Sequence, residues 1–170
     1  MTGVQTCALP IWRITWSAFV DHLEDVEVIS DKLAASTEFM DMVEKSDSLF
    51  VGPYDDTLMQ VLHGQPNEQR PEYVQAVRAE CAPNKLSAGI ELGIETATTF
   101  EKITGLSTVF ARDVTGLYGG VSWFTGVADL RAAEAAEAAI MNDKKWTSLI
   151  ERAGTVYQSG AITRMFRRLS

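Results

Sequence analysis

The chain has 170 residues, a formal net charge of −8 and an apolar content of 46%. This length allows one large or two small domains, and the apolar content is ordinary for a packed globular protein. Because phosphate binding needs a basic face, the acidic balance argues against nucleic acid as a partner. No apolar run approaches the roughly 20 residues that cross a bilayer, so no membrane partner is expected.

The first eleven residues, MTGVQTCALPI, resemble a translated sequencing-library adapter. We therefore expect residues 1–11 to be an artefact, to pack loosely, and to mark an open reading frame cut at its 5′ end. Of the two cysteines, Cys7 falls in this segment and Cys81 remains. A single cysteine gives no disulfide framework, which favours a reducing, cytoplasmic setting.

The first half of the natural chain predicts a strand, a broken helix and a second strand. Arg13–Val20 is rich in aromatic and β-branched residues, which is typical of a strand. Apolar residues then recur at helical spacing across residues 26–43, with a break at Ser36, a residue type that caps helix N-termini. Thr57–His63 is the return strand, and the polar stretch Gln65–Arg70 is the linker that closes a first domain over residues 12–64.

The second half, residues 71–170, predicts a longer series of strands and helices. The helix after the first strand has Asn84 as its expected N-cap and Gly105 as its expected C-cap. In order, the predicted elements are a strand at Glu72–Cys81, a helix over Leu86–Phe100, a hairpin of Ser107–Val114 and Leu117–Val127, a helix capped by Asp129 that is interrupted at Asn142–Asp143, and a last strand at Ala161–Leu169.

The two halves are related by an internal repeat. Trp12–His63 aligns without a gap on Gly119–Ser170, which places Trp16 on Trp123 and Leu33 on Ile140. Residues 71–170 follow the β-α-β-β-α-β order of a ferredoxin-like unit, and residues 12–64 supply only the last β-α-β of that order. The predicted fold is therefore α+β, with tandem ferredoxin-like units of which the first is truncated and the second is complete. The strands of the first unit are expected to be sheet edges or additions to the second unit's sheet.

Two stretches carry a resemblance to a known superfamily. They are ITGLSTVFARDVTGLYGGVSWFTG (Ile103–Gly126) and NDKKWTSLIERAGTVYQSGAITRMFRRL (Asn142–Leu169). Together they resemble dimeric α/β-barrel proteins, most closely the NIPSNAP and antibiotic-biosynthesis-monooxygenase-like group of small bacterial proteins. The resemblance implies that two antiparallel sheets face each other and close a barrel, either within one chain or between copies in a homo-oligomer. It also implies a range of activities that includes cofactor-free monooxygenases and isomerases.

The candidate ligand-binding residues are two arginines and two tryptophans. Arg78 and Arg112 lie in predicted strands, where their planar guanidinium groups could hold a carboxylate or enolate inside a barrel. Exposed strand charges are the favoured alternative. Trp16 and Trp123 occupy equivalent positions and could form an aromatic wall, although packing in the core is the favoured interpretation.

The remaining reactive residue types predict little chemistry. His22 and His63 are the two histidines, and no HxH or HExxH spacing occurs, so we expect neither a metal site nor a cofactor. His63 could be a haem ligand, but an ordinary surface histidine is favoured. Cys81 is favoured as a small apolar residue at a strand end over a nucleophile.

Two functions remain open from the sequence. The first is a small organic ligand bound inside the barrel, with a monooxygenase- or isomerase-like reaction as its catalytic form. The second is a non-catalytic binding or assembly protein whose barrel is filled by side chains. A cavity with convergent polar groups would favour the first, and a solid interior would favour the second.

Overall fold

A computed structural model describes residues 15, 17–47, 56–66 and 70–169 of the chain. The chain divides into two compact units, Met1–Tyr54 and Asp55–Ser170. Within the described part of the chain, no helix is long and apolar enough to cross a membrane.

Among its described residues, the first unit contains two helices, α1 (Leu23–Ala34) and α2 (Thr37–Asp47). They are separated at Ser36, as predicted, because the Ser36 hydroxyl oxygen accepts the Phe39 backbone N–H at 3.2 Å and so caps α2. The strand predicted for residues 13–20 is wrong where the structure describes it, since residues 15 and 17–20 form no strand. The rest of that segment, Trp16 included, lies outside the described residues.

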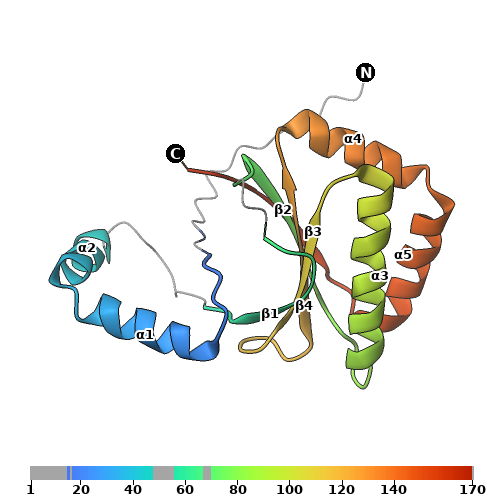
Figure 1. Cartoon of the computed structure of the whole chain (residues 1–170). Helices are drawn as coiled ribbons and strands as arrows, with labels where there is room; N and C mark the ends of the chain where they lie inside the picture. The colour runs from blue at the N-terminus through green and yellow to red at the C-terminus, as the bar shows by residue number, and fades with distance from the viewer. Residues whose placement is uncertain (1–14, 16, 48–55, 67–69, 170) are drawn as a thin grey trace. The chain divides into compact units, whose positions relative to one another are not determined.

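The second unit is a five-stranded antiparallel sheet with three helices (Figure 1). The strands are β1 (Met59–His63), β2 (Tyr73–Glu80), β3 (Thr108–Asp113), β4 (Gly120–Val127) and β5 (Ile162–Arg167). The helices are α3 (Leu86–Thr104), α4 (Leu130–Met141) and α5 (Lys144–Val156).

The strand order in the sheet is β1-β3-β4-β2-β5. Without β1, this is the ferredoxin-like arrangement, in which the first and third strands of a β-α-β-β-α-β unit lie at the centre. The sequence-based fold of residues 71–170 is therefore confirmed. β1 is added at the edge beside β3, with Val61 opposite Ala111, as expected for the strand at Thr57–His63.

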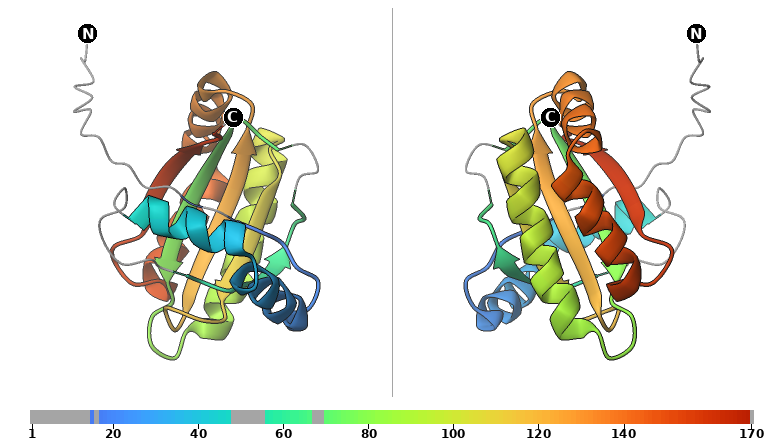
Figure 2. Two further views of the ribbon diagram at one scale, coloured as in Figure 1. Left: turned by 90° about the vertical axis from the view of Figure 1, so that its left-hand side faces the viewer. Right: turned by 90° about the vertical axis from the view of Figure 1, so that its right-hand side faces the viewer.

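The helices α3 and α5 lie side by side over one face of the sheet (Figure 2, right). The core between them and the strands contains Phe110, Val121, Trp123 and Ala97. Gly93 lets α3 approach closely, because a Cβ atom there would overlap the Phe110 ring. Close packing of α3 on the sheet thus explains a glycine that its helix propensity alone would disfavour.

The helix caps are mostly those that the sequence predicts. Asp129 accepts the Ala132 backbone N–H at 2.8 Å, and the N–H of Gly105, at φ 73°, donates to the Glu101 carbonyl at 2.8 Å. The prediction for Asn84 is wrong: Asn84 has a left-handed φ of 62°, and the N-cap of α3 is the next residue, Lys85. Asn84 therefore turns the chain before the helix, and asparagine adopts this left-handed conformation more readily than most residues do.

Candidate functional site

Arg78 lies on the sheet face opposite α3 and α5, which we call the helix-free face because, among the described residues of the second unit, no helix packs on it. Its neighbours in the strand, Val77 and Ala79, pack in the helix-covered core, and successive side chains of a strand alternate between faces. The register places Arg78 opposite Ser122 of β4 and Ile162 of β5. Arg78 therefore lies on an inner strand of the sheet, near the end where β3 finishes and β5 begins.

Arg78 forms an ion pair with Asp113. The guanidinium Nη2 donates to the Asp113 carboxylate oxygen Oδ2 across β4. The Asp113 side chain is only 1% exposed, whereas the Arg78 side chain remains 29% exposed. A buried carboxylate needs a cation and hydrogen bonds to stay charged, so Asp113 both positions the guanidinium and depends on it.

Gly120 makes room for this pair. A Cβ atom at Gly120 would overlap the Asp113 carboxylate, so any larger residue at the start of β4 would displace Asp113. The contribution of Gly120 to the site could not be predicted from the sequence, because it depends on the pairing of β3 with β4.

The rest of the helix-free face is largely apolar and partly made of small residues. By strand register, it carries apolar side chains from all five strands: Val61, Val74, Ala76, Val109, Ala111, Phe124, Ile162 and Phe166. Ala111 and Ser122 are small and flank the Arg78–Asp113 pair. The register also places Arg164 of β5 on this face, opposite Ala76, so the face carries a second cation besides Arg78. A largely apolar surface with such cations suits an organic molecule that has an apolar body and an anionic group.

The second candidate arginine, Arg112, does not join Arg78. Arg112 follows the core residue Phe110 at a spacing of two, so its side chain leaves the sheet on the helix-covered side. Its Nε donates to the Gln60 side-chain oxygen at 2.9 Å, at the β1 edge. The expectation that both arginines face one cavity is therefore not met.

Trp123 is a core residue, as the favoured interpretation held. Its ring lies 5.0 Å from the Phe110 ring and makes an edge contact with Tyr157 at 5.6 Å between centroids. Its indole N–H donates to the Gly93 carbonyl at 3.0 Å. With its only donor used and its faces packed, Trp123 is not an aromatic wall for a ligand.

His63 contacts an acidic residue rather than a set of ligating groups. Its Nε2 lies 3.2 Å from Glu101 Oε2, and the other oxygen of Glu101 accepts the Thr108 backbone N–H at 2.9 Å. Among the residues that the structure describes, no cluster of three or more histidine, cysteine, aspartate or glutamate side chains could hold a metal ion. His63 thus ties β1 to α3.

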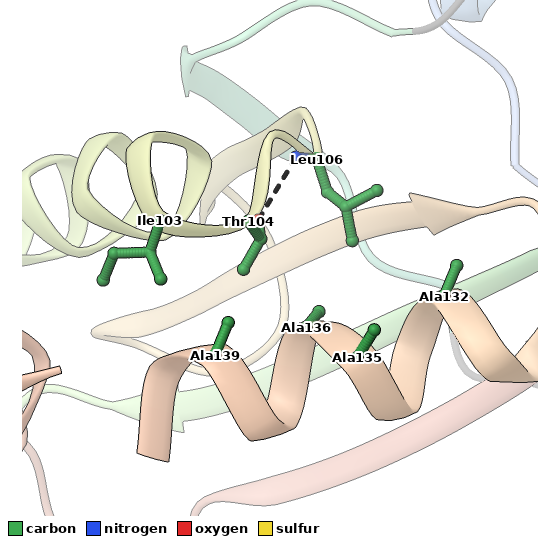
Figure 3. A pocket seen from close by; sticks show the side chains of 7 residues that line it. All are labelled: Ile103, Thr104, Leu106, Ala132, Ala135, Ala136 and Ala139. Carbon is green, nitrogen blue, oxygen red and sulfur yellow. Dashed lines mark hydrogen bonds between the residues drawn. The ribbon is translucent and has the colours of Figure 1, made fainter. Parts of the chain in front are cut away.

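Two surface hollows lie away from Arg78. The first, of about 270 Å³, lies between the end of α3 and the alanine-rich face of α4 (Figure 3). Its polar lining residue, Thr104, already donates its hydroxyl to the Phe100 carbonyl at 2.8 Å and accepts the Leu106 N–H at 3.2 Å. The second hollow, of about 310 Å³, is lined by Arg167 and Arg168, and both arginines pair there with Glu72. Neither hollow offers convergent groups for chemistry.

Cys81 and Tyr157 are joined by a β-bridge and lie together at the edge of the core. The Tyr157 hydroxyl donates to the Gly89 carbonyl at 2.5 Å, and a Cβ atom at Gly89 would overlap the Cys81 sulfur. Burial, and to a lesser extent the neighbouring Cys81, raises the pKa of the Tyr157 phenol above its ordinary range. Burial, followed by the charge of Glu80, likewise raises the pKa of the Cys81 thiol, which makes Cys81 a poor nucleophile.

These raised pKa values predict a loss of stability at alkaline pH. An acid whose folded pKa is raised contributes full stability below its unfolded pKa, and this contribution falls as pH rises from there towards the folded value. With unfolded-state pKa values of about 8.5 for cysteine and about 10 for tyrosine, the free energy of unfolding should decline between about pH 9 and pH 11.

Urea denaturation across this range should show a shallower decline for Tyr157→Phe than for the wild type. A matched Tyr118→Phe control, at a side chain 88% exposed, should follow the wild type. Equal slopes in all three proteins would contradict the assignment.

Comparison with known proteins gives fold-level likenesses. No protein-family model matches the chain, and no curated protein matches it. An uncharacterised NIPSNAP-like domain protein from Burkholderia xenovorans superimposes with a TM-score of 0.51 at 10% identity, covering 60% of this chain and 89% of its own. A NIPSNAP family protein from Agrobacterium tumefaciens has 18% identity and a TM-score of 0.49, covering 55% of this chain and 90% of its own.

An anthrone oxidase-like protein superimposes with a TM-score of 0.50 at 14% identity, covering 59% of this chain and 45% of its own. At these identities the likenesses speak for the fold and not for the chemistry. The strand order of the second unit and the superposition on the NIPSNAP-like domain protein thus agree on a ferredoxin-like α+β fold.

Proposed function

We propose that the second unit binds a small organic anion on the helix-free face, with Arg78 holding the anionic group. The observation that carries this proposal is the position of the Arg78–Asp113 pair, beside the small residues Ala111 and Ser122 on a largely apolar face. A guanidinium has five N–H donors in a planar fork, more than one carboxylate oxygen can use. A ligand carboxylate or enolate can therefore add to the existing pair without replacing Asp113.

The ion pair favours a ligand over a face that is simply filled by side chains. Covering a charged pair with apolar side chains costs desolvation energy that the mutual attraction of the charges often fails to repay. A ligand oxygen placed on Arg78 would instead add a polar contact to the guanidinium. We further propose that a second copy of the chain covers the site with its own sheet, as the superfamily resemblance implies.

A second candidate function is non-catalytic assembly through the same face. It is favoured by the apolar residues that extend over all five strands, including the exposed side chains Val61 and Ile162. In that case the face would bind another sheet directly, and small anions would have no effect on stability.

Thermal unfolding with benzoate, the simplest planar aromatic carboxylate, separates the two candidates. A ligand at about ten times its dissociation constant stabilises the folded state by about 1.4 kcal/mol, which raises the Tm by a few degrees. The double variant Arg78→Gln with Asp113→Asn should lose this rise. It removes both charges of the pair together, and so avoids leaving a buried carboxylate without its cation.

Arg112→Gln is the matched control, because it removes an arginine from the opposite side of the same sheet. The proposal requires a benzoate-dependent rise in the wild type and in Arg112→Gln but not in the double variant. No rise in any protein would favour the assembly candidate, and an equal rise in all three would place the anion elsewhere.

A further inference from the structure

The helix pair α1–α2 has the same layout as the pair α4–α5. Under the alignment of Trp12–His63 with Gly119–Ser170, α1 (Leu23–Ala34) falls on residues 130–141, which are the bounds of α4. Thr37, where α2 begins, falls on Lys144, where α5 begins. The helix boundaries therefore follow the alignment, although they did not enter into it.

The caps between the helices also correspond. Ser36 accepts the Phe39 backbone N–H at 3.2 Å, and its counterpart Asp143 accepts the Trp146 backbone N–H at 2.9 Å. Each of these two residues also accepts, through its backbone carbonyl, the N–H four positions later, at 3.0 Å for Met40 and at 3.1 Å for Thr147. The same turn thus separates the helices in both pairs.

The two pairs differ in what covers their apolar positions. In the α4–α5 pair, three positions are buried by the rest of the second unit: Ala136, Ile140 and Leu149, at 7%, 6% and 1% exposure. Their counterparts in the first unit are all apolar and exposed: Ile29, Leu33 and Met42, at 43%, 41% and 57%. Apolar residues at matched positions of one helix face indicate a surface that binds another element.

The covered pair indicates which element that is. Both α4 and α5 pack on α3. The ring of Trp146 contacts that of Phe100 at 5.8 Å, and Arg152 donates to both carboxylate oxygens of Glu95 at 3.1 and 2.9 Å. The counterpart of Trp146 is Phe39, which is aromatic, and the counterpart of Arg152 is Lys45, which is cationic. The first unit thus keeps the side-chain types that meet α3 in the second.

We propose that the exposed face of α1–α2 is a docking surface for an amphipathic helix with the chemistry of α3. Such a helix carries an acidic residue at the position of Glu95, to pair with Lys45, and an aromatic residue at the position of Phe100, to contact Phe39. The surface lies in the first unit, so it does not depend on the proposed function of the second.

A labelled peptide of residues 84–105 tests this surface on the full chain by fluorescence anisotropy. The peptide should bind saturably, and the double variant Leu33→Asn with Met42→Gln should weaken binding by about tenfold, because both side chains lie in the proposed contact. The control variants Asp31→Asn and Glu44→Gln, on the opposite faces of α1 and α2, should bind as the wild type does. All of these changes are neutral or remove one charge, so none adds repulsion against the peptide.

A charge exchange tests the orientation of the bound helix. The peptide with Glu95→Lys should bind about threefold more weakly to the wild type, and Lys45→Glu in the chain should restore its affinity. The proposal is overturned if peptide binding does not saturate. It is also overturned if the double variant Leu33→Asn with Met42→Gln leaves the peptide's affinity unchanged, which is the result expected if the peptide exchanges with the chain's own α3. Self-association that this double variant abolishes, without any peptide binding, would make a second copy the occupant and would also overturn it.

Discussion

Replacing Trp123 with alanine is expected to lower the free energy of unfolding by about 3–5 kcal/mol, the range found for large aromatic residues in cores. The ring packs against Phe110 and Tyr157, and its N–H satisfies the Gly93 carbonyl at 3.0 Å. Alanine would leave a cavity beneath α3 and a buried carbonyl without this donor. Urea denaturation measures the loss directly.

Trp123→Phe is the matched control for this prediction. It keeps an aromatic ring in the core and removes the N–H donor, so its cost should be nearer the roughly 0.5–1.5 kcal/mol of one lost hydrogen bond. A loss of less than about 1 kcal/mol for Trp123→Ala would mean that the ring is not core. That result would return Trp123 to the residues that could contact a ligand.

Gly93→Ala should also destabilise the fold, by about 1–3 kcal/mol, although alanine is the better helix former by about 1 kcal/mol. The new Cβ atom would overlap the Phe110 ring, which is fully buried and cannot move aside freely. Combining it with Phe110→Leu should recover part of the loss, because a smaller side chain leaves room for the methyl group. A double-mutant cycle from urea denaturation measures this coupling.

Gly154→Ala is the control for Gly93→Ala. Gly154 lies in α5, and a Cβ atom there would meet nothing within 4 Å. Alanine at this position should stabilise the protein by about 0.4–1 kcal/mol. Equal effects at the two glycines would contradict the close approach of α3 to the sheet.

The order of elements in the second unit could be predicted from the sequence, because each carries a local signal. The apolar spacing of α3, the short connection between the hairpin strands Ser107–Val114 and Leu117–Val127, and the cap Asp129 are all short-range features. Two expectations that rested on local signals failed. Asn84 takes a left-handed turn conformation instead of capping the helix, and the aromatic, β-branched composition of residues 13–20 did not produce a strand at the residues described. Strand propensity of that kind needs a neighbouring strand to become structure.

The candidate site was less predictable, since it depends on which face each strand residue occupies. Arg78 and Arg112 are the same residue type in predicted strands, yet the register places them on opposite sides of the sheet. Arg112 projects from the helix-covered side of the sheet, where its long side chain reaches Gln60 at the β1 edge. The pairing of Arg78 with Asp113 crosses an intervening strand, and no sequence spacing encodes such a contact.

An NMR titration of the isotope-labelled chain with benzoate tests the anion site on the helix-free face most directly. The signal of the Arg78 side-chain N–H and the backbone amides near Ser122 and Ala111 should shift saturably, because these groups surround the proposed binding position. The double variant Arg78→Gln with Asp113→Asn should show no saturable shift at those amides. Saturable shifts confined to the α3–α4 hollow around Thr104, or none anywhere on the sheet, would contradict the proposed site.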